Sequence, residues 1–159
     1  MNYNFSQDII DGENGEKRVA DLFQYKCPQI TSITYNKDCR YDLVLNLNDQ
    51  RIITVEVKTD YFLHKTGNIA IETKCRGKDS GINVTQSDLF VIYNKTRFKE
   101  HVYVFKTSWL KNAILSPFYK RVIGGDIKQG QPVTEMVLIP LILIPNKYVD
   151  LMERKEIKL

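Results

Sequence analysis

Two segments of alternating apolar and polar residues, 41–47 and 51–58, predict a β-hairpin in the first half of the chain. Their apolar positions are Leu43, Leu45 and Leu47 in the first segment and Ile53, Val55 and Val57 in the second. Both apolar faces join one core only if the numbers of opposed residues sum to an even number, because a slip of one residue turns every side chain to the other face. A tight turn centred on Asp49 gives a sum of 98, which places Leu43 opposite Val55.

The same register brings charged residues together on the other face of the hairpin. Asp42 is expected opposite Glu56, at the separation of about 4.5–5.5 Å between Cβ atoms of a directly opposed pair, and Lys58 lies two residues further along. Two carboxylates this close repel each other. Because a bound cation is the simplest way to reverse that repulsion, the hairpin predicts a metal site.

The rest of the pattern predicts one domain, residues 1–159, of the α/β or α+β class. Apolar residues at spacings of three and four predict a helix over residues 6–25, and Thr85–Asp88 has the residue types of a helix start. The other expected elements are strands at 30–35, 68–72, 89–93, 102–105 and within 135–144, a helix at 107–115, a mobile loop at 124–134 and a short helix after Asn146. This order predicts a mixed central sheet with helices on its faces.

Glu16 interrupts the apolar stripe of the first predicted helix, close to Val19, Ala20 and Phe23. A carboxylate on a core-facing stripe needs a partner. Either Glu16 lies at the edge of the stripe and pairs with a lysine, or it reaches the acidic face of the hairpin.

The ligand types at this face favour Mg²⁺ or Mn²⁺ over zinc, because hard cations take oxygen ligands. Asp42 and Glu56 would bind the metal directly, the carbonyl of Val57 would be a third ligand, and Glu16 would hold a water or a second ion. Lys58 could orient the attacking water, act as a base or neutralise the phosphate. These residues leave the three roles open, and they fit one ion or two.

Charge is unevenly distributed along the 159 residues. The net charge of +4 divides into −3 for residues 1–60 and +7 for residues 61–159. A basic region beside an acidic centre suits a polyanionic substrate, although lysine-rich surfaces also serve solubility alone. The basic and aromatic candidates for contact with DNA are Tyr61, His64, Lys65, Lys74, Arg76 and Lys78. Such a mixture suits phosphate contact and base stacking, and the alternative is two ordinary surface loops.

The cysteine pattern and the hydropathy of the chain indicate the cellular compartment in which the protein is expected. Cys27, Cys39 and Cys75 are odd in number and form no CxxC pair, which favours a reducing, intracellular setting over a disulfide framework or zinc site. No apolar stretch is long enough to span a bilayer, and no secretion signal opens the chain. We therefore expect a cytoplasmic protein without a membrane partner.

Asp42, a gap of thirteen residues, and Glu56-Val57-Lys58, preceded by the helical Gly15-Glu16, resemble the motif of the PD-(D/E)XK nuclease superfamily. Tyr41 stands where many members have a proline. The resemblance covers residues 10–93. It implies a restriction-endonuclease-like core of order α-β-β-β-α-β and Mg²⁺-dependent cleavage of DNA.

Within that superfamily, the small size and the helical glutamate resemble Holliday-junction resolvases and compact phage or mobile-element endonucleases, including homing endonucleases. The segments 66–72 and 81–85 are similar to small phage-type members. This similarity implies that Glu72 lies at the edge of the site, that Thr85 and Asp88 support it, and that a phage-encoded enzyme would act in the host cytoplasm.

The leading hypothesis is a Mg²⁺-dependent endodeoxyribonuclease that acts on branched or otherwise structured DNA. A homodimer or higher homo-oligomer is expected, because a twofold pair places two sites on two strands. The alternatives are a sequence-specific homing or restriction-type endonuclease, an RNA-processing enzyme, and a non-catalytic nucleic-acid-binding protein on a nuclease-like scaffold.

Overall fold

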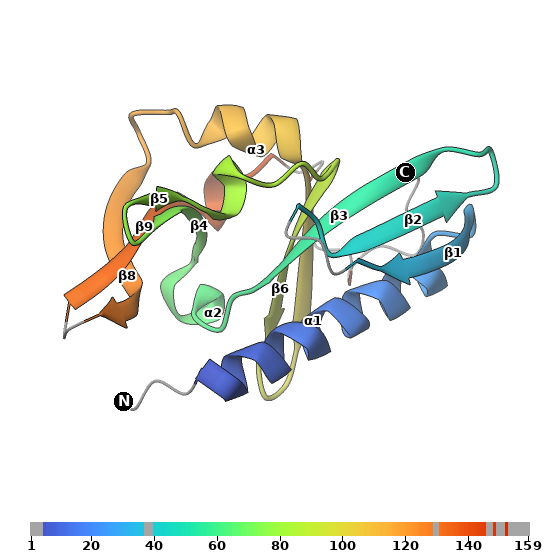
Figure 1. Ribbon diagram of the computed structural model, residues 1–159, viewed down its shortest axis with the longest axis horizontal. Helices are drawn as coiled ribbons and strands as arrows, with labels where there is room; N and C mark the ends of the chain where they lie inside the picture. The colour runs from blue at the N-terminus through green and yellow to red at the C-terminus, as the bar shows by residue number, and fades with distance from the viewer. Residues whose placement is uncertain (1–4, 37–39, 129–130, 146–147, 149–151, 153–159) are drawn as a thin grey trace.

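A computed structural model of the chain describes residues 5–36, 40–128, 131–145, 148 and 152 (Figure 1). Its helices are α1 (Phe5–Lys26), α2 (Leu63–Thr66) and α3 (Thr107–Ala113), with short 3-10 turns at Gly81–Asn83 and Leu141–Leu143. Its strands are β1 (Ile30–Tyr35), β2 (Leu43–Leu47), β3 (Ile52–Thr59), β4 (Asn68–Cys75), β5 (Lys78–Asp79), β6 (Leu89–Lys95), β7 (Glu100–Lys106), β8 (Lys120–Lys128) and β9 (Gln131–Pro140). The order begins α-β-β-β-α-β, as the resemblance implies, but its second helix, α2, was not predicted by the sequence pattern. None of the described helices is long and apolar enough to cross a membrane.

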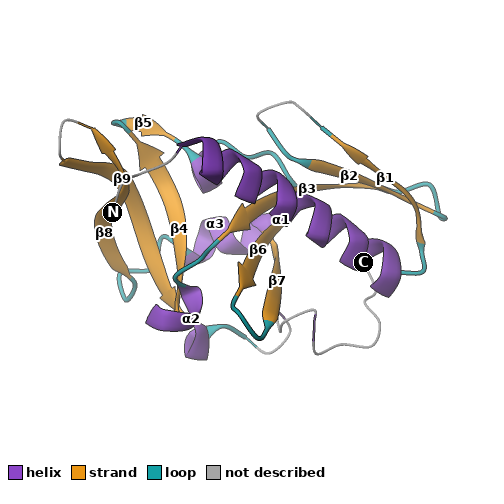
Figure 2. Cartoon of the chain, turned by 90° about the horizontal axis from the view of Figure 1, so that it is seen from below, coloured by secondary structure: helices purple, strands orange, loops and turns teal. Residues whose placement is uncertain are grey.

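The first sheet is mixed and has the strand order β1-β2-β3-β6-β7 in the described chain. Strands β3 and β6 run parallel, and the other neighbours run antiparallel. Leu43 pairs with Val55 and Leu45 with Ile53, which is the register that the apolar parity predicts. Helix α1 covers one face of this sheet through buried side chains such as Phe23 (Figure 2). The predicted α+β class with a mixed central sheet is therefore confirmed.

A second sheet, of order β5-β4-β9-β8, lies on the other side of the first (Figure 2). Its buried side chains, including Ile71 and Ile139, share one core with Phe90, Ile92 and Phe105 of the first sheet. The sequence predicted strands within β4 and β9 but did not predict that they belong to a separate sheet. The candidate site lies on the side of the first sheet that meets the second.

Two predicted elements are wrong and one lies largely outside the described residues. Residues 124–134 are not an open loop, because β8 and β9 pair through most of this segment, with Gly124 opposite Thr134. Thr85–Asp88 does not begin a helix, because the chain passes directly into β6. Of the expected helix after Asn146, only residues 148 and 152 are described.

Helix α1 approaches β3 closely at Gly15. A Cβ atom added there would overlap Oγ1 of Thr59 and lie 3.3 Å from Cδ1 of Tyr93. Because Gly15 precedes Glu16, this approach also sets the position of the Glu16 carboxylate.

Gly15→Ala is expected to lower the melting temperature, because the helix or the Thr59 side chain must shift, at a cost of about 1–3 kcal/mol. Gly12→Ala is the matched control: nothing lies within 4 Å of a Cβ added at Gly12, and alanine favours a helix by up to about 1 kcal/mol. Thermal melts of the two variants should therefore shift in opposite directions. Equal shifts would contradict the close approach at Gly15.

Candidate active site

Glu56 and Lys58 form an ion pair on the face of β3 that is turned away from α1. Successive residues of a strand point to opposite faces. Val55 and Val57 therefore pack in the core under α1, while Glu56 and Lys58 lie on the face that is turned toward the second sheet, beside Phe90 and Ile92 of β6. Nζ of Lys58 lies 2.7 Å from Oε1 of Glu56. The Glu56 side chain is 8% exposed and that of Lys58 is 47% exposed, so the ammonium group can meet a substrate.

Asp42 lies immediately before β2, where the pairing between β2 and β3 ends. Its N–H donates to the carbonyl of Val55 (2.9 Å), and its Oδ2 accepts from the N–H of Val57 (2.7 Å). Because the N–H and C=O of one strand residue point to the same edge, the carbonyl of Val57 faces the edge that β2 leaves uncovered. The expected third ligand is thus beside Asp42.

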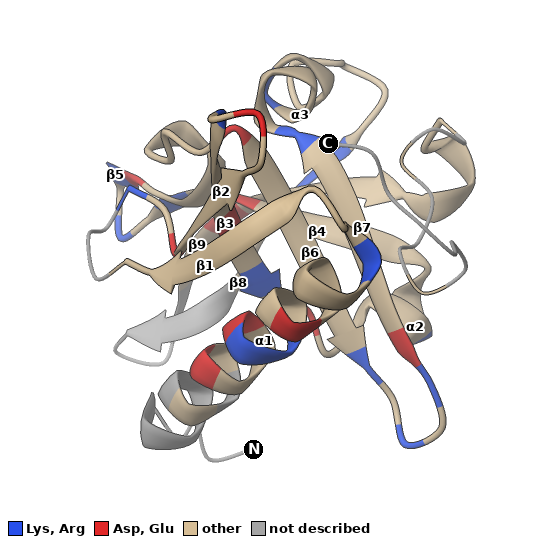
Figure 3. Ribbon diagram, turned by 90° about the vertical axis from the view of Figure 1, so that its right-hand side faces the viewer, with Lys and Arg blue, Asp and Glu red and all other residues tan. Residues whose placement is uncertain are grey.

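Glu16 lies on α1, whose acidic residues are red in Figure 3, close enough to the hairpin for the charges of Asp42, Lys58 and Glu56 to act on its carboxyl group. Burial raises the pKa of Glu16, and the negative charge of Asp42 raises it further, while Lys58 acts in the opposite direction. The sequence left open whether Glu16 pairs with a lysine at the edge of the stripe or reaches the hairpin. The structure places it within the electrostatic field of the hairpin charges.

Glu16→Gln is expected to raise the melting temperature of the metal-free protein at pH 7.5 by about 1–3 °C. A carboxyl group whose folded pKa is raised stabilises the fold when protonated, and this contribution is lost as pH rises through the raised pKa. The gain should therefore vanish near pH 4. Glu13→Gln, at an exposed position one turn earlier on α1, serves as the control and should change little. A gain that is independent of pH would contradict charge repulsion as its cause.

The charges of Glu56 and Lys58 respond to burial and to each other. Burial raises the pKa of Glu56 and outweighs the opposing effect of Lys58, while Asp42 adds to the rise. Burial opposes the charge of Lys58, but Glu56, Asp42 and Glu72 together outweigh it, so the pKa of Lys58 is raised. In the metal-free protein Lys58 is therefore a cation that donates hydrogen bonds.

Glu56 is hydrogen-bonded to a buried network of hydroxyl groups. Oγ1 of Thr85 lies 3.3 Å from Oε2 of Glu56 and 3.0 Å from both Oγ of Ser87 and the carbonyl of Arg40. Oγ of Ser87 in turn lies 3.1 Å from Oγ1 of Thr107. The sequence analysis predicted Thr85 as a supporting residue but did not predict Ser87 or Thr107. The signal available for Ser87 was that it and Thr85 are two hydroxyl residues shortly before an apolar strand.

The other two predicted edge residues behave differently from each other. Glu72 of β4 lies near enough to Lys58 to raise the pKa of that lysine, and its Oε1 accepts a hydrogen bond from Ser80. Asp88 is not at the site: its Oδ2 accepts from the backbone N–H of Thr54 (2.8 Å) and from the hydroxyl of Thr54 (2.9 Å). Asp88 thus joins the start of β6 to β3.

The donor set at the site fits Mg²⁺ or Mn²⁺. Within the described ranges, no three His, Cys, Asp or Glu side chains gather closely enough to hold a metal by themselves. Mg²⁺ does not need three, because it keeps several waters and commonly binds through one or two carboxylates and the phosphate of a substrate. Asp42, Glu56 and the carbonyl of Val57 supply oxygen atoms only. Burial and then the charge of Asp42 raise the pKa of Glu56, and a bound cation would favour the charged carboxylate against both effects.

The predicted DNA-contacting residues divide into two groups at opposite ends of β4. Tyr61, His64 and Lys65 are exposed on and before α2, where Nζ of Lys65 lies 5.6 Å from the ring centroid of Phe62. The other group comprises Lys74, Arg76 and Lys78, at the turn between β4 and β5. Glu72 lies between the two groups along β4, so each flanks the site from a different side.

Comparison with known proteins finds no matching family model and no curated protein of matching sequence. Among solved structures, the chain is similar to a bacterial homing endonuclease, I-Ssp6803I, with a TM-score of 0.48 and 17% sequence identity. The matched region covers 82% of this chain and 85% of that chain.

Proposed function

We propose that this protein is a metal-dependent endonuclease that hydrolyses phosphodiester bonds in branched or otherwise structured DNA. The observation that carries the proposal is the grouping of Glu56, Lys58 and Asp42 at the uncovered end of one hairpin, with a 2.7 Å ion pair and a 2.7 Å carboxylate-to-backbone bond. Two acids and a lysine held this way match what a phosphate and a hard cation need.

Each residue has a role that its position supports. Asp42, Glu56 and the carbonyl of Val57 would hold Mg²⁺ or Mn²⁺, which when bound supplies charge neutralisation at the phosphate and a more acidic water. Lys58 offers a half-exposed ammonium group to the phosphate oxygens, and Thr85 fixes the orientation of Glu56. Glu16 on α1 is within electrostatic range of Asp42, Lys58 and Glu56, and in this proposal it orients a water.

A sequence-specific enzyme of the homing or restriction type is the second candidate. The observation that favours it is the part of the β8–β9 pairing that extends beyond β4, where Ile127 pairs with Pro132, because a two-stranded ribbon can enter the major groove of duplex DNA. A non-catalytic nucleic-acid-binding protein would need no facing acids, and their repulsion would then be an uncompensated cost.

We also propose a homo-oligomer. The supporting observation is a set of exposed apolar side chains near the start of β8 and the end of β9. Phe118 and Ile142 are each 91% exposed, and Leu115 is 71% exposed. Exposed apolar side chains of this kind suit a contact with a second copy. Analytical ultracentrifugation of the wild type and of Phe118→Ser tests this: a monomeric wild type would contradict it.

The test of the proposed function is a cleavage panel with the full chain. Four-way junctions, flaps, linear duplex, single strands and RNA are each incubated with Mg²⁺, Mn²⁺ or EDTA. We expect cleavage of branched DNA that requires either metal and is absent in EDTA. Preferential cleavage of linear duplex at one sequence would favour the second candidate, and no cleavage of any substrate would overturn the proposal.

A further inference from the structure

The hairpin between β6 and β7 ends in a compact basic and aromatic tip, residues 95–99. Lys95, Arg97 and Lys99 give this tip three positive charges and no negative one. Phe98 between them is 86% exposed. Among the described residues, no carboxylate forms an ion pair with these three cations, and the hairpin projects past α1 in Figures 1 and 3.

Thr96 holds the tip in one conformation. Its Oγ1 accepts hydrogen bonds from the N–H groups of Phe98 (3.3 Å) and Lys99 (2.9 Å), and its own N–H donates to the carbonyl of Lys99 (2.8 Å). The guanidinium carbon of Arg97 lies 5.5 Å from the ring centroid of Phe98. The exposed ring is therefore presented by a braced turn, which reduces the entropy lost when a ligand binds.

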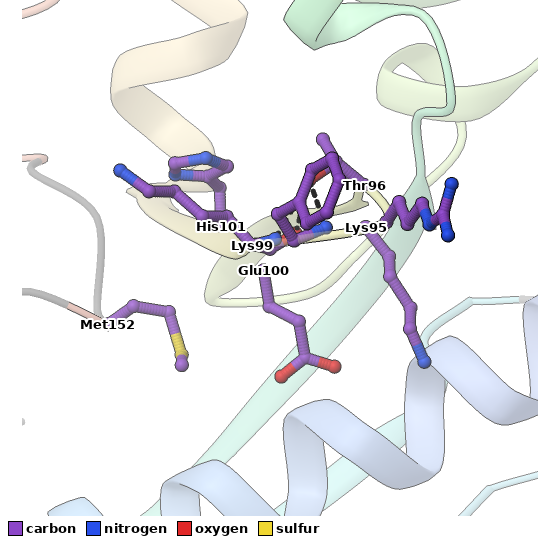
Figure 4. A pocket seen from close by; sticks show the side chains of 8 residues that line it. Lys95, Thr96, Lys99, Glu100, His101 and Met152 are labelled. Carbon is purple, nitrogen blue, oxygen red and sulfur yellow. Dashed lines mark hydrogen bonds between the residues drawn. The ribbon is translucent and has the colours of Figure 1, made fainter.

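The tip borders a depression of about 550 Å³ (Figure 4). A second depression is lined by both Lys95 and Tyr61, so the tip adjoins the segment that leads into α2. Figure 4 shows Lys99 and His101 on one side of this depression, with Met152 opposite. The N–H of Asp60 donates to the carbonyl of Tyr93 (2.8 Å), which holds the start of the α2 segment beside the end of β6. The exposed Tyr61 and the tip thus belong to one continuous region.

The tip also has a defined relation to the candidate active site. Lys58 on β3 is directly opposite Ile92 on the parallel strand β6, and β6 ends three residues later at Lys95. At about 3.3 Å per residue, the tip begins about 10 Å beyond the level of Lys58 along the sheet. This separation corresponds to about three stacked bases of a nucleic acid at about 3.4 Å each.

We propose that the β6–β7 tip binds unpaired DNA bases, with Phe98 as the stacking residue and Arg97 and Lys99 as phosphate contacts. The inference rests on the proposed function and deepens it, because it assigns the preference for branched DNA to one element. An exposed aromatic ring flanked by cations suits a single-stranded segment, since every base offers a face for stacking and the phosphates neutralise the cations. In an intact duplex the bases are already stacked, so Phe98 gains nothing there.

The stacking is tested by equilibrium binding of fluorescent DNA in EDTA, where cleavage is blocked. Phe98→Ala is expected to weaken binding to a single strand and a splayed fork by about 5- to 150-fold, while binding to linear duplex changes less than about twofold. Tyr25→Ala is the matched control, because Tyr25 is 84% exposed but lies near the C-terminal end of α1. Phe98→Trp should retain affinity, and its added fluorescence should be quenched by the single strand.

The phosphate contacts are tested by the salt dependence of binding. Arg97→Ser/Lys99→Ser should reduce the slope of log K against log salt by about 1.4 on a single strand, because each phosphate contact contributes about 0.7. Lys106→Ser/Lys120→Ser removes the same charge from exposed positions at the other end of β7 and on β8 and should leave the slope unchanged. Equal slopes for the two double variants would overturn the assignment of these contacts.

The outcomes separate this inference from the proposed function. If the wild type cleaves branched DNA and Phe98→Ala binds and cleaves it as the wild type does, the tip assignment is wrong while the nuclease stands. If the wild type cleaves nothing but Phe98→Ala loses affinity for single strands selectively, the tip assignment holds and the nuclease proposal fails. A loss that is equal on duplex and single strand would also overturn the stacking role.

Discussion

Lys58→Ala is expected to lower the cleavage rate by at least about 10²–10³-fold while DNA binding in EDTA stays within a few-fold of the wild type. In the proposed mechanism Lys58, whose Nζ lies 2.7 Å from Oε1 of Glu56, places its positive charge where charge develops on the phosphate. That interaction strengthens in the transition state, so its loss appears in the rate rather than in ground-state binding. Glu56→Ala should behave in the same way. Single-turnover cleavage and fluorescence anisotropy measure the two quantities.

The same hairpin provides a matched control. Like Glu56 and Lys58, Asp49 and Arg51 are two residues apart and form an ion pair with an N···O distance of 2.7 Å. This second pair lies at the turn of the hairpin and not at the candidate site. Arg51→Ala and Asp49→Ala should therefore cleave DNA as the wild type does. Full cleavage by Lys58→Ala would remove the basis of the nuclease proposal, and a loss of binding equal to the loss of cleavage would show that Lys58 only holds the DNA.

The hairpin and its charges could be predicted because the necessary information is local. The parity of Leu43 and Val55 determines the register, and the short turn at Asp49 leaves little freedom in how the strands pair. Asp42 departs from the prediction in one respect, since it lies just before β2 and bonds to the N–H of Val57 instead of pairing within the ladder. The group of charges is nevertheless the predicted one.

The second sheet could not be predicted because its pairings are long-range. Glu72 of β4 pairs with Met136 of β9, and no local pattern in either strand identifies the other as its partner. Gly124 and the polar residues after it favour a loop by propensity, yet the ladder with β9, in which Gly124 pairs with Thr134 and Ile127 with Pro132, overrides that preference.

The hydroxyl network behind Glu56 explains why Thr85–Asp88 is not a helix start. A helix N-cap side chain would accept from the backbone two or three residues later, in a chain that then continues as a helix. Thr85 binds the N–H of Ser87 but also contacts Glu56, while Asp88 binds Thr54. Such side-chain bonds compete with helix formation, and their partners are distant in sequence.

Asp42→Asn is expected to abolish the stabilisation of the protein by Mg²⁺. For the wild type, Mg²⁺ at about 100 times its dissociation constant should add about 2.7 kcal/mol to the free energy of unfolding, or roughly 5–11 °C in melting temperature. The substituted amide would be neutral yet would keep an oxygen that can accept from the N–H of Val57, so the fold should persist. Asp88→Asn is the control, because Asp88 is bound to Thr54 away from the site. Melts with Mg²⁺ and with EDTA give the comparison, and a Mg²⁺ shift in Asp42→Asn equal to that of the wild type would contradict metal binding at the end of this hairpin.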